Sequence, residues 1–167
     1  MSENEVDDFR NEVITQWVTF ELDNEFYGIN VLKIREVLRM TEITPVPGAP
    51  ESALGIINLR GVVVTVIDTR VHFGLPIEKT DDMTRIIIVD IDQERMVGLL
   101  VDGVSEVVNL YESKIEIAPS VGNDERSKYI YGVSQKGEYL LILIDVNKLF
   151  GLPEADAGVM GDDDELF

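Results

Sequence analysis

The chain has 167 residues, of which 14 are basic and 32 acidic, so its formal charge is −18; it contains no cysteine and one histidine, His72. These counts exclude disulfide scaffolds, cysteine nucleophiles, thiolate metal sites and any triad or metal site that needs two or more histidines from one chain. The acidity also argues against nucleic acid and anionic membrane surfaces as partners, because both require clustered lysine and arginine.

The two ends of the chain carry much of this acidity. Residues 1–12 hold five acidic residues and one basic residue, and residues 154–167 hold six acidic residues and no basic one. Neither segment shows apolar periodicity, so we expect two disordered tails. The run Asp162–Glu165 lacks the spaced oxygens and central glycine of an EF-hand, which favours a solvated tail over a calcium loop.

No segment of the chain has the composition of a membrane span or a leader. The first residues lack the apolar stretch of a secretory signal, and no apolar run approaches the roughly 18–20 residues that cross a bilayer. We therefore expect a soluble cytoplasmic protein without membrane insertion.

The first half of the region between the tails is typical of short strands and turns. Val18–Leu22 alternates apolar and polar residues, which predicts a half-buried strand, and Asp23–Glu25 is a polar hairpin turn. Val31–Leu38 fits a tight turn followed by a strand, although its apolar spacing also fits a helix. We expect a short helix over Glu51–Ile57, and the β-branched run Val62–Ile67 predicts a buried strand.

A strand–helix–stop pattern closes this half. Asp68 can cap a short helix after the strand, Gly74 suits its left-handed end, and Pro76 prevents its continuation. Farther along, Ile86–Val89 is another β-branched run, and Asp92–Glu94 is a second polar hairpin turn.

The second half ends in the same way. Leu140–Ile144 predicts a buried strand, and Asp145, Gly151 and Pro153 repeat the cap, the glycine and the proline. Ser127–Tyr131 is the counterpart of the short helix expected in the first half.

An internal repeat explains this similarity. Leu54–Pro76 matches Tyr131–Pro153 without a gap at seven of 23 positions, an offset of 77 residues, where roughly one or two matches are expected from ordinary usage. Asp23–Leu38 matches Gln93–Val108 at an offset of 70. The aligned pairs of this second match are Gly28/Gly98, Val31/Val101, Ile34/Val104, Glu36/Glu106 and Val37/Val107. We interpret the chain as two tandem copies of one unit of about 70–75 residues.

The repeated unit suits a small closed β-barrel. About five short strands per unit would leave exposed edges unless the sheet closes. A unit of this size is marginal alone, so we expect the two copies to share an apolar core and to form a groove at their junction. We assign barrel 1 to about residues 13–80 and barrel 2 to about 84–153. The sequence leaves open whether the N-terminal strand pairs within its own barrel or crosses to the other.

The sequence offers little for catalysis. His72 lies in a short helix and is best interpreted as a surface or packing residue. The chain has no glycine-rich phosphate loop, and we expect no cofactor or metal. A hydrolase that uses two carboxylates leaves no sequence pattern and stays an alternative.

Two charged residues stand out as candidates for binding. Arg60 lies in a turn beside the junction, where its planar donors could anchor a partner or simply be solvated, and its aligned residue is Gly137. Glu36 is shared with Glu106, which favours a structural role such as pairing with a backbone amide or with a basic residue. The apolar residues on either side of Glu36 could instead form a docking patch.

Several motifs together resemble the CheW-like family of chemotaxis coupling proteins, over about Val13–Pro153. They are Phe26–Ile29, Ile34–Val37, Thr44–Pro47, Gly55–Gly61, Val66–Arg70, Phe73–Gly74 and Val97–Asp102. The family commonly has Pro at the place of Thr65 and Leu at the place of Thr69. Neither departure is expected to disturb the fold.

The resemblance implies a fold and a function. The fold is all-β, with two SH3-like five-stranded barrels around a shared core. The function is that of a non-enzymatic adaptor that links the cytoplasmic tips of chemoreceptors to the regulatory domain of the histidine kinase CheA, monomeric when free and assembled into mixed rings. A coupling module of another kinase pathway would have the same fold.

The resemblance also implies contact residues. Carried over by motif, the receptor-facing residues are Ile34, Glu36, Val37 and Arg60, and Val104 in the second copy joins the same surface. The kinase contact would use mainly apolar edges of the second barrel, and the sequence identifies no residues for it.

Overall fold

The computed structural model describes residues 12–76, 79–92, 94–117 and 125–150. Its strands are β1 (Ile14–Leu22), β2 (Glu25–Asn30), β3 (Ile34–Arg39), β4 (Ala53–Leu59), β5 (Val62–Asp68), β6 (Arg85–Asp90), β7 (Met96–Val101), β8 (Gly103–Tyr111), β9 (Ile130–Lys136) and β10 (Tyr139–Ile144). The short helices are α2 (Thr69–His72) and α3 (Val146–Leu149), with 3₁₀ turns η1 (Val31–Lys33), η2 (Glu112–Lys114) and η3 (Glu125–Tyr129).

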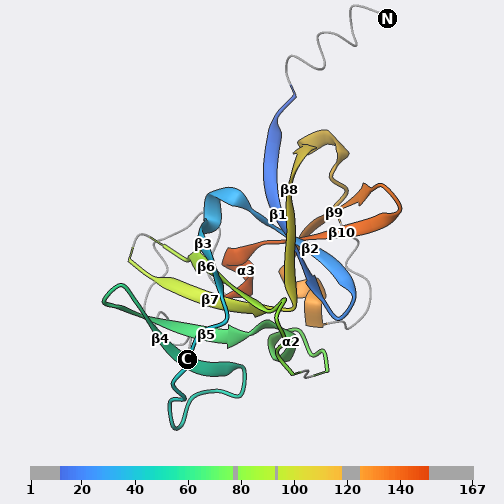
Figure 1. The fold of residues 1–167 in the computed structure, drawn as a ribbon. Helices are drawn as coiled ribbons and strands as arrows, with labels where there is room; N and C mark the ends of the chain where they lie inside the picture. The colour runs from blue at the N-terminus through green and yellow to red at the C-terminus, as the bar shows by residue number, and fades with distance from the viewer. Residues whose placement is uncertain (1–11, 77–78, 93, 118–124, 151–167) are drawn as a thin grey trace, which may run out of the picture.

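The strands form two five-stranded sheets, each curled into a barrel (Figure 1). Barrel A has the strand order β8-β1-β2-β10-β9, and barrel B has the order β3-β6-β7-β5-β4. Isolated bridges add Thr44 to Ile56 in barrel B and Glu116 to Val133 in barrel A. The predicted all-β class with two SH3-like five-stranded barrels is therefore confirmed.

Strands are exchanged between the two halves of the chain. The hairpin β1–β2 from the first half joins β8, β9 and β10, and the hairpin β6–β7 from the second half joins β3, β4 and β5. A division of the chain at residues 80–84 therefore does not separate the two sheets. The two strand orders correspond position by position, which is the arrangement that two copies of one unit produce when they swap hairpins.

Two repeated glycines sit where the backbones approach most closely. A Cβ at Gly55 would lie 2.1 Å from the carbonyl oxygen of Thr44, and a Cβ at Gly132 would lie 2.8 Å from the carbonyl oxygen of Glu116. In both cases the carbonyl belongs to the residue outside the named strands, Thr44 or Glu116, that forms the isolated bridge of its barrel. Only glycine permits this approach, so the match of Gly55 with Gly132 reflects the same steric requirement in both copies.

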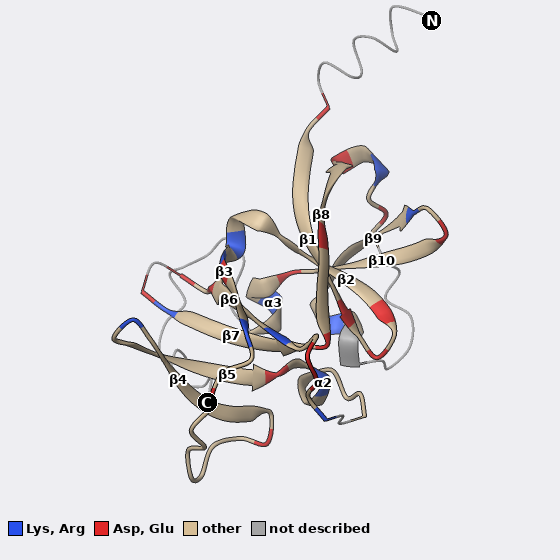
Figure 2. Ribbon diagram, viewed as in Figure 1, with Lys and Arg blue, Asp and Glu red and all other residues tan. Residues whose placement is uncertain are grey.

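The apolar side chains form three clusters. The largest lies between the barrels and includes Phe20, Tyr27, Ile67, Phe73, Leu99 and Ile144. A second cluster, around Val66 and Ile88, fills barrel B, and a third, around Trp17 and Leu143, fills barrel A. The expected shared core is thus present, and it explains why the central strands are apolar on both faces. Charged residues lie mainly at turns and strand ends (Figure 2).

Most of the local predictions agree with the structure. η1 followed by β3 matches the turn and strand expected over Val31–Leu38. The carboxylates of Asp68 and Asp145 cap α2 and α3, and Gly74 has a φ of +74°. The predicted tails and Gly151 lie outside the described residues, apart from Glu12.

Two local predictions are wrong, namely the helix over Glu51–Ile57 and the half-burial of the strand Val18–Leu22. The helix expected over Glu51–Ile57 is largely strand β4, because residues of this segment alternate in burial and pair with β5. In its counterpart, the 3₁₀ turn η3 ends at Tyr129 and β9 begins directly after it. The strand over Val18–Leu22 exists but is not half-buried, since Thr19 is fully buried. Its hydroxyl bonds both the amide and the carbonyl of Glu106, which makes burial of this polar residue tolerable.

Candidate functional site

A β-bulge in β3 decides which residues that strand presents. Ile34 lies opposite Val89 on β6, and Val37 lies opposite Ile87, so three steps along β3 match two steps along β6. Val89 and Ile87 both belong to the shared core. Their partners Ile34 and Val37 therefore face the same side of the strand, despite their spacing of three residues. Ile34 packs against the shared core, whereas Val37 is 39% exposed.

Strand β8 repeats this arrangement in barrel A. Val104 lies opposite Phe20 on β1, and Val107 lies opposite Val18, again across a bulge. Val104 packs against the shared core, and Val107 is 54% exposed. Equivalent apolar pairs therefore occur in both barrels. Val107 was aligned with Val37 by the repeat but was not chosen from the sequence; the offset of 70 residues was the signal that pointed to it.

Arg60 occupies a strained turn position. It forms the two-residue loop between β4 and β5 with Gly61, and both have positive φ, +51° for Arg60 and +87° for Gly61. Such loops favour Asn, Asp or Gly at the first position, because other side chains cost roughly 1–2 kcal/mol in the left-handed region. The second copy has Gly137 there, with a φ of +61°. A strained arginine where glycine would suffice points to a role for its side chain.

The side chain of Arg60 pairs with Glu36. Nη1 donates to Oε1 of Glu36 at 3.2 Å, and Nη2 donates to Oε2, so the ion pair is bidentate. The Arg60 side chain is 69% exposed and that of Glu36 is 26% exposed. The hydrogen bond from Arg60 lowers the pKa of Glu36, and the same bond raises the pKa of Arg60. Both groups therefore stay charged, and the free edges of the guanidinium face solvent.

The structure thus brings some of the predicted residues together. Glu36 and Arg60 are in direct contact, so of the two partners considered for Glu36, a backbone amide or a basic residue, the structure shows the basic residue. Ile34 and Val37 share one face of the same strand. Val104 lies on the other barrel, in the position equivalent to Ile34. The assignment of these five residues to receptor binding stays a prediction.

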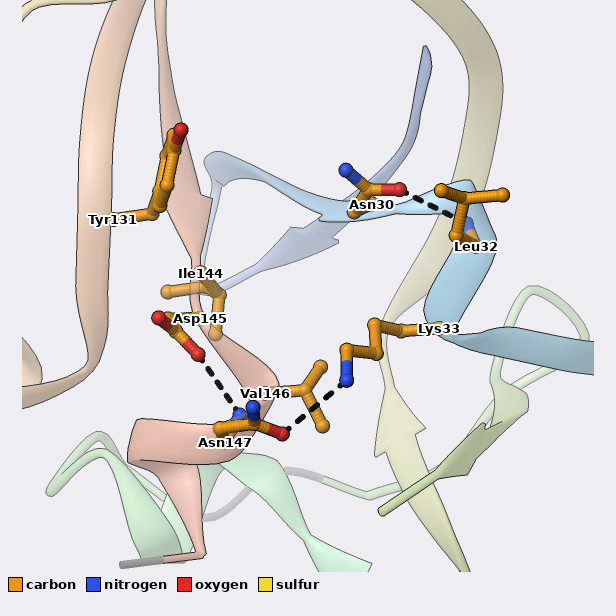
Figure 3. Close-up of a pocket in the computed structure, with 8 residues that line it drawn as sticks. All are labelled: Asn30, Leu32, Lys33, Tyr131, Ile144, Asp145, Val146 and Asn147. Carbon is orange, nitrogen blue, oxygen red and sulfur yellow. Dashed lines mark hydrogen bonds between the residues drawn. The ribbon is translucent and has the colours of Figure 1, made fainter. Parts of the chain in front are cut away.

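The junction also holds a cavity of about 300 Å³ (Figure 3). Its lining includes Leu32 and Lys33 of η1, Tyr131 of β9, and Val146 and Asn147 of α3. It lies at the crossover from barrel A to barrel B, and its walls are mainly apolar.

The hydrolase alternative requires two acids that meet at a substrate, and among the described carboxyl groups Asp68 is the best candidate for one of them. Burial raises the pKa of Asp68, and Asp102 adds to this effect. However, the Asp68 carboxylate accepts the amide of Arg70 as the cap of α2, and Asp102 is paired with the Arg70 guanidinium. This arrangement is a helix cap beside an ion pair and not two acids that converge on a substrate.

In the part of the chain that the structure describes, no three or more histidine or carboxylate side chains come together in a way that could hold a metal ion. None of the helices described there has the length and apolarity needed to cross a membrane.

Comparison with known proteins places these features in a family. The family model described as a CheW-like domain matches residues 16–154. The chain belongs to the CheW-like family. It is 37% identical over 139 residues to the chemotaxis protein CheW of Klebsiella aerogenes, with 83% of each chain covered. It is 33% identical over 145 residues to CheW of Bacillus subtilis, covering 85% of this chain and 90% of that one.

A solved CheW structure has the same fold. The scaffolding protein TtCheW from Thermoanaerobacter tengcongensis matches with a TM-score of 0.76 and 34% identity, over 84% of this chain and 94% of that chain. These relatives are named as chemotaxis and scaffolding proteins, and none of those cited here is named as an enzyme. The family to which this chain belongs is accordingly one of chemotaxis scaffold proteins.

Proposed function

We propose that this protein couples the cytoplasmic tips of chemoreceptors to the regulatory domain of the histidine kinase CheA. It would act in the cytoplasm and reach the inner face of the membrane through the receptors. The proposal rests on membership of the CheW family together with one observation, the strained and exposed Arg60 held by Glu36. A guanidinium fixed in this way presents its remaining donors to a partner without losing much side-chain freedom on binding.

The receptor would contact both a charged group and exposed apolar groups. Val37 adds exposed apolar area on β3, and Val107 adds it on β8. Buried aliphatic contacts with a charged anchor at the edge are a common composition of protein interfaces. Several modest contacts suffice, because an array of receptors raises the effective concentration of each one.

Arg60→Gly tests the role of the arginine side chain separately from folding. Glycine relieves the positive φ, so the variant should be at least as stable as the parent protein. Its apparent affinity for receptor-containing membranes should nevertheless fall about tenfold or more in co-sedimentation, because the charged anchor is lost. Glu36→Ala should weaken binding in the same direction.

A matched control is Arg35→Ala. Arg35 lies on the same strand and forms an exposed ion pair with Asp90 at 3.1 Å, but it is not among the predicted contact residues. This variant should bind receptors as the parent does. If Arg60→Gly and Glu36→Ala both bind receptor and kinase normally, the site assignment is wrong.

The kinase partner needs a separate experiment. The second half of the chain, whose strands β8, β9 and β10 lie in barrel A, exposes the apolar residues Tyr111 and Leu140, which suits the apolar edges expected for this contact. A pull-down with the intact chain should recover CheA through its regulatory domain. Recovery of a different kinase would instead assign the chain to another signalling pathway.

A further inference from the structure

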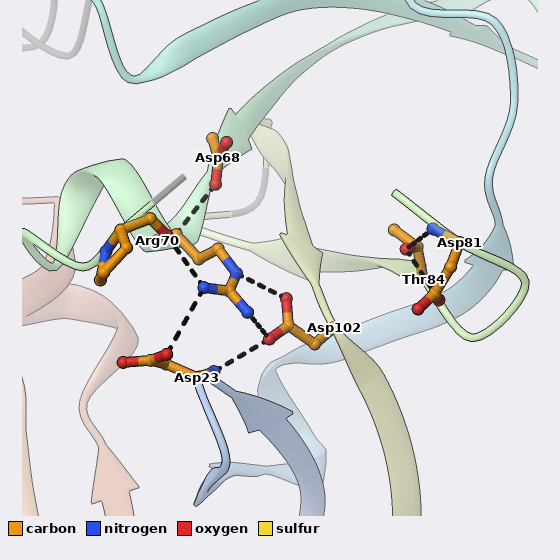
Figure 4. Close-up of polar contacts among 7 residues, drawn as sticks. Asp23, Asp68, Arg70, Asp81, Thr84 and Asp102 are labelled. Atoms are coloured by element: carbon orange, nitrogen blue, oxygen red, sulfur yellow. Dashed lines mark hydrogen bonds and ion pairs between the residues drawn. The ribbon is translucent and has the colours of Figure 1, made fainter. Parts of the chain in front are cut away.

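A nearly buried arginine joins the two barrels. Arg70 lies on α2, which continues β5 of barrel B, and the residue is 8% exposed. Its Nε donates to Oδ1 of Asp102 at 2.8 Å, and Nη2 donates to Oδ2 of the same carboxylate (Figure 4). Nη1 donates to the carbonyl oxygen of Pro76 at 2.9 Å. The guanidinium is therefore held on three sides in one orientation.

Asp102 connects this arginine to the other barrel. It stands between β7 of barrel B and β8 of barrel A, where the chain crosses over. Its carboxylate accepts the amide of Asp23 at 2.9 Å, and its own amide donates to the carbonyl of Glu21 at 3.0 Å. Asp23 lies in the β1–β2 turn of barrel A, with Oδ1 3.8 Å from Nη1 of Arg70. One carboxylate thus bonds elements of both barrels.

The equivalent junction of the repeat lacks this network. The repeat aligns Arg70 with Asn147 and Asp102 with Leu32. There, Lys33 donates a single bond of 3.3 Å to Asn147, and Leu32 is 86% exposed. The cavity of about 300 Å³ shown in Figure 3 lies at this second junction. Among the described residues, a charged network therefore occupies one junction, whereas the aligned positions of the other carry the Lys33–Asn147 hydrogen bond beside a cavity.

We propose that Arg70 and Asp102 fix the angle between the two barrels, as positioning residues for the surface that spans them. The shared apolar core holds the barrels together, but apolar burial has little directionality and tolerates small rotations. A bidentate guanidinium–carboxylate pair is directional and does not. The network therefore sets the relative placement of Ile34 on β3 and Val104 on β8, which come from different barrels. Only this consequence for receptor binding rests on the proposed function; the fixed angle does not.

The absence of cysteine makes the angle measurable. Cysteines introduced at Val63 on β5 and Leu140 on β10, which are 64% and 50% exposed, carry one spin label on each barrel. In this labelled protein, Arg70→Asn installs the residue that the second copy has. Electron–electron dipolar spectroscopy should show a narrow distance distribution for the parent, and a broadened and shifted one for Arg70→Asn. Arg70→Lys, which keeps the charge but not the paired donors, should lie between them.

Two controls keep the result interpretable. Arg35→Asn breaks an ion pair within barrel B, between β3 and β6, and should leave the distribution unchanged. Amide exchange should accelerate about tenfold or more at Asp23 in Arg70→Asn, while amides at the centre of β6 keep their protection, which shows that the barrels remain folded. If the Asp23 amide exchanges faster but the distance distribution does not change, the network is only local and the inference is wrong.

The link to receptor binding has its own outcome. A changed distance distribution with reduced receptor co-sedimentation supports both the fixed angle and its role in the binding surface. A changed distribution with normal co-sedimentation would refute the positioning role and leave the proposed function intact, since Arg60→Gly tests that function independently.

Discussion

In the part of the chain that the structure describes, the hydroxyl of Thr69 is a buried side-chain oxygen that has no hydrogen-bond partner, and the residue is 1% exposed. A buried hydroxyl in this state costs roughly 1–3 kcal/mol. Valine has nearly the same shape and a similar helix propensity, and the cap of α2 is supplied by Asp68. Thr69→Val should therefore raise the free energy of unfolding by about 1–2 kcal/mol, and the melting temperature by about 2–4 °C for each kcal/mol.

Thr19→Val is the matched control, because it makes the same chemical change at a paired hydroxyl. Thr19 donates to the carbonyl of Glu106 at 2.9 Å and accepts its amide at 3.0 Å. Removal of the Thr19 hydroxyl takes a hydrogen-bond partner from the amide and from the carbonyl of Glu106, and it should lower the free energy of unfolding by about 1–3 kcal/mol. Urea unfolding with a common m-value measures both changes. If the two variants shift in the same direction by similar amounts, the reasoning about Thr69 is refuted.

Three further predictions concern charge and backbone geometry. Burial raises the pKa of Asp68 above its ordinary 3.8. The ionised carboxylate therefore lowers the free energy of unfolding once pH has risen through the pKa of the folded state, and this loss is absent below the pKa of the unfolded state. Since asparagine caps helices as well as aspartate, Asp68→Asn should match or exceed the stability of the parent at neutral pH, and the difference should shrink in urea unfolding below about pH 4. Because the pKa of Glu36 is lowered by Arg60, the ion pair adds stability above the pKa of the unfolded state, and this stability is lost as pH falls through the pKa of the folded state. In Arg60→Ala, the midpoint of the Glu36 titration followed by NMR should move up towards 4.5. An unchanged midpoint would contradict the pairing. Gly55→Ala places a Cβ 2.1 Å from a backbone oxygen and should prevent stable folding, whereas Gly137→Ala meets open space at a φ of +61° and should cost only about 1–2 kcal/mol in chemical unfolding.

Local structure could be predicted where a single short-range cause determines it. The caps at Asp68 and Asp145 follow from a carboxylate that precedes a helical turn, and the strand Val62–Ile67 follows from β-branched residues in an unbroken run. The segment over Glu51–Ile57 shows the limit. A short apolar run is compatible with either a helix or a strand, and pairing with β5 decides in favour of the strand.

The exchange of hairpins was not predictable in the same way. Apolar patterning shows that a strand has buried faces but does not identify its neighbours in the sheet. The candidate site had the same difficulty. The residues Glu36 and Arg60 were chosen separately, and only the fold brings them into contact across 24 positions of sequence. The bulge that places Val37 on the same face as Ile34 also left no local signal, because one extra residue in a strand does not change its composition.

The duplication provides an internal control for separating structural from functional residues. Both barrels have the same strand order, and both keep the glycines at positions 55 and 132 and the capping aspartates at positions 68 and 145. A feature that only one of the two barrels possesses is not required by the barrel fold as such. Arg60 has glycine as its counterpart, and Arg70 has asparagine, yet barrel A closes without either arginine. The strain at Arg60 and the burial of Arg70 are therefore costs that the fold itself does not demand, which points to a role for these two side chains beyond barrel formation.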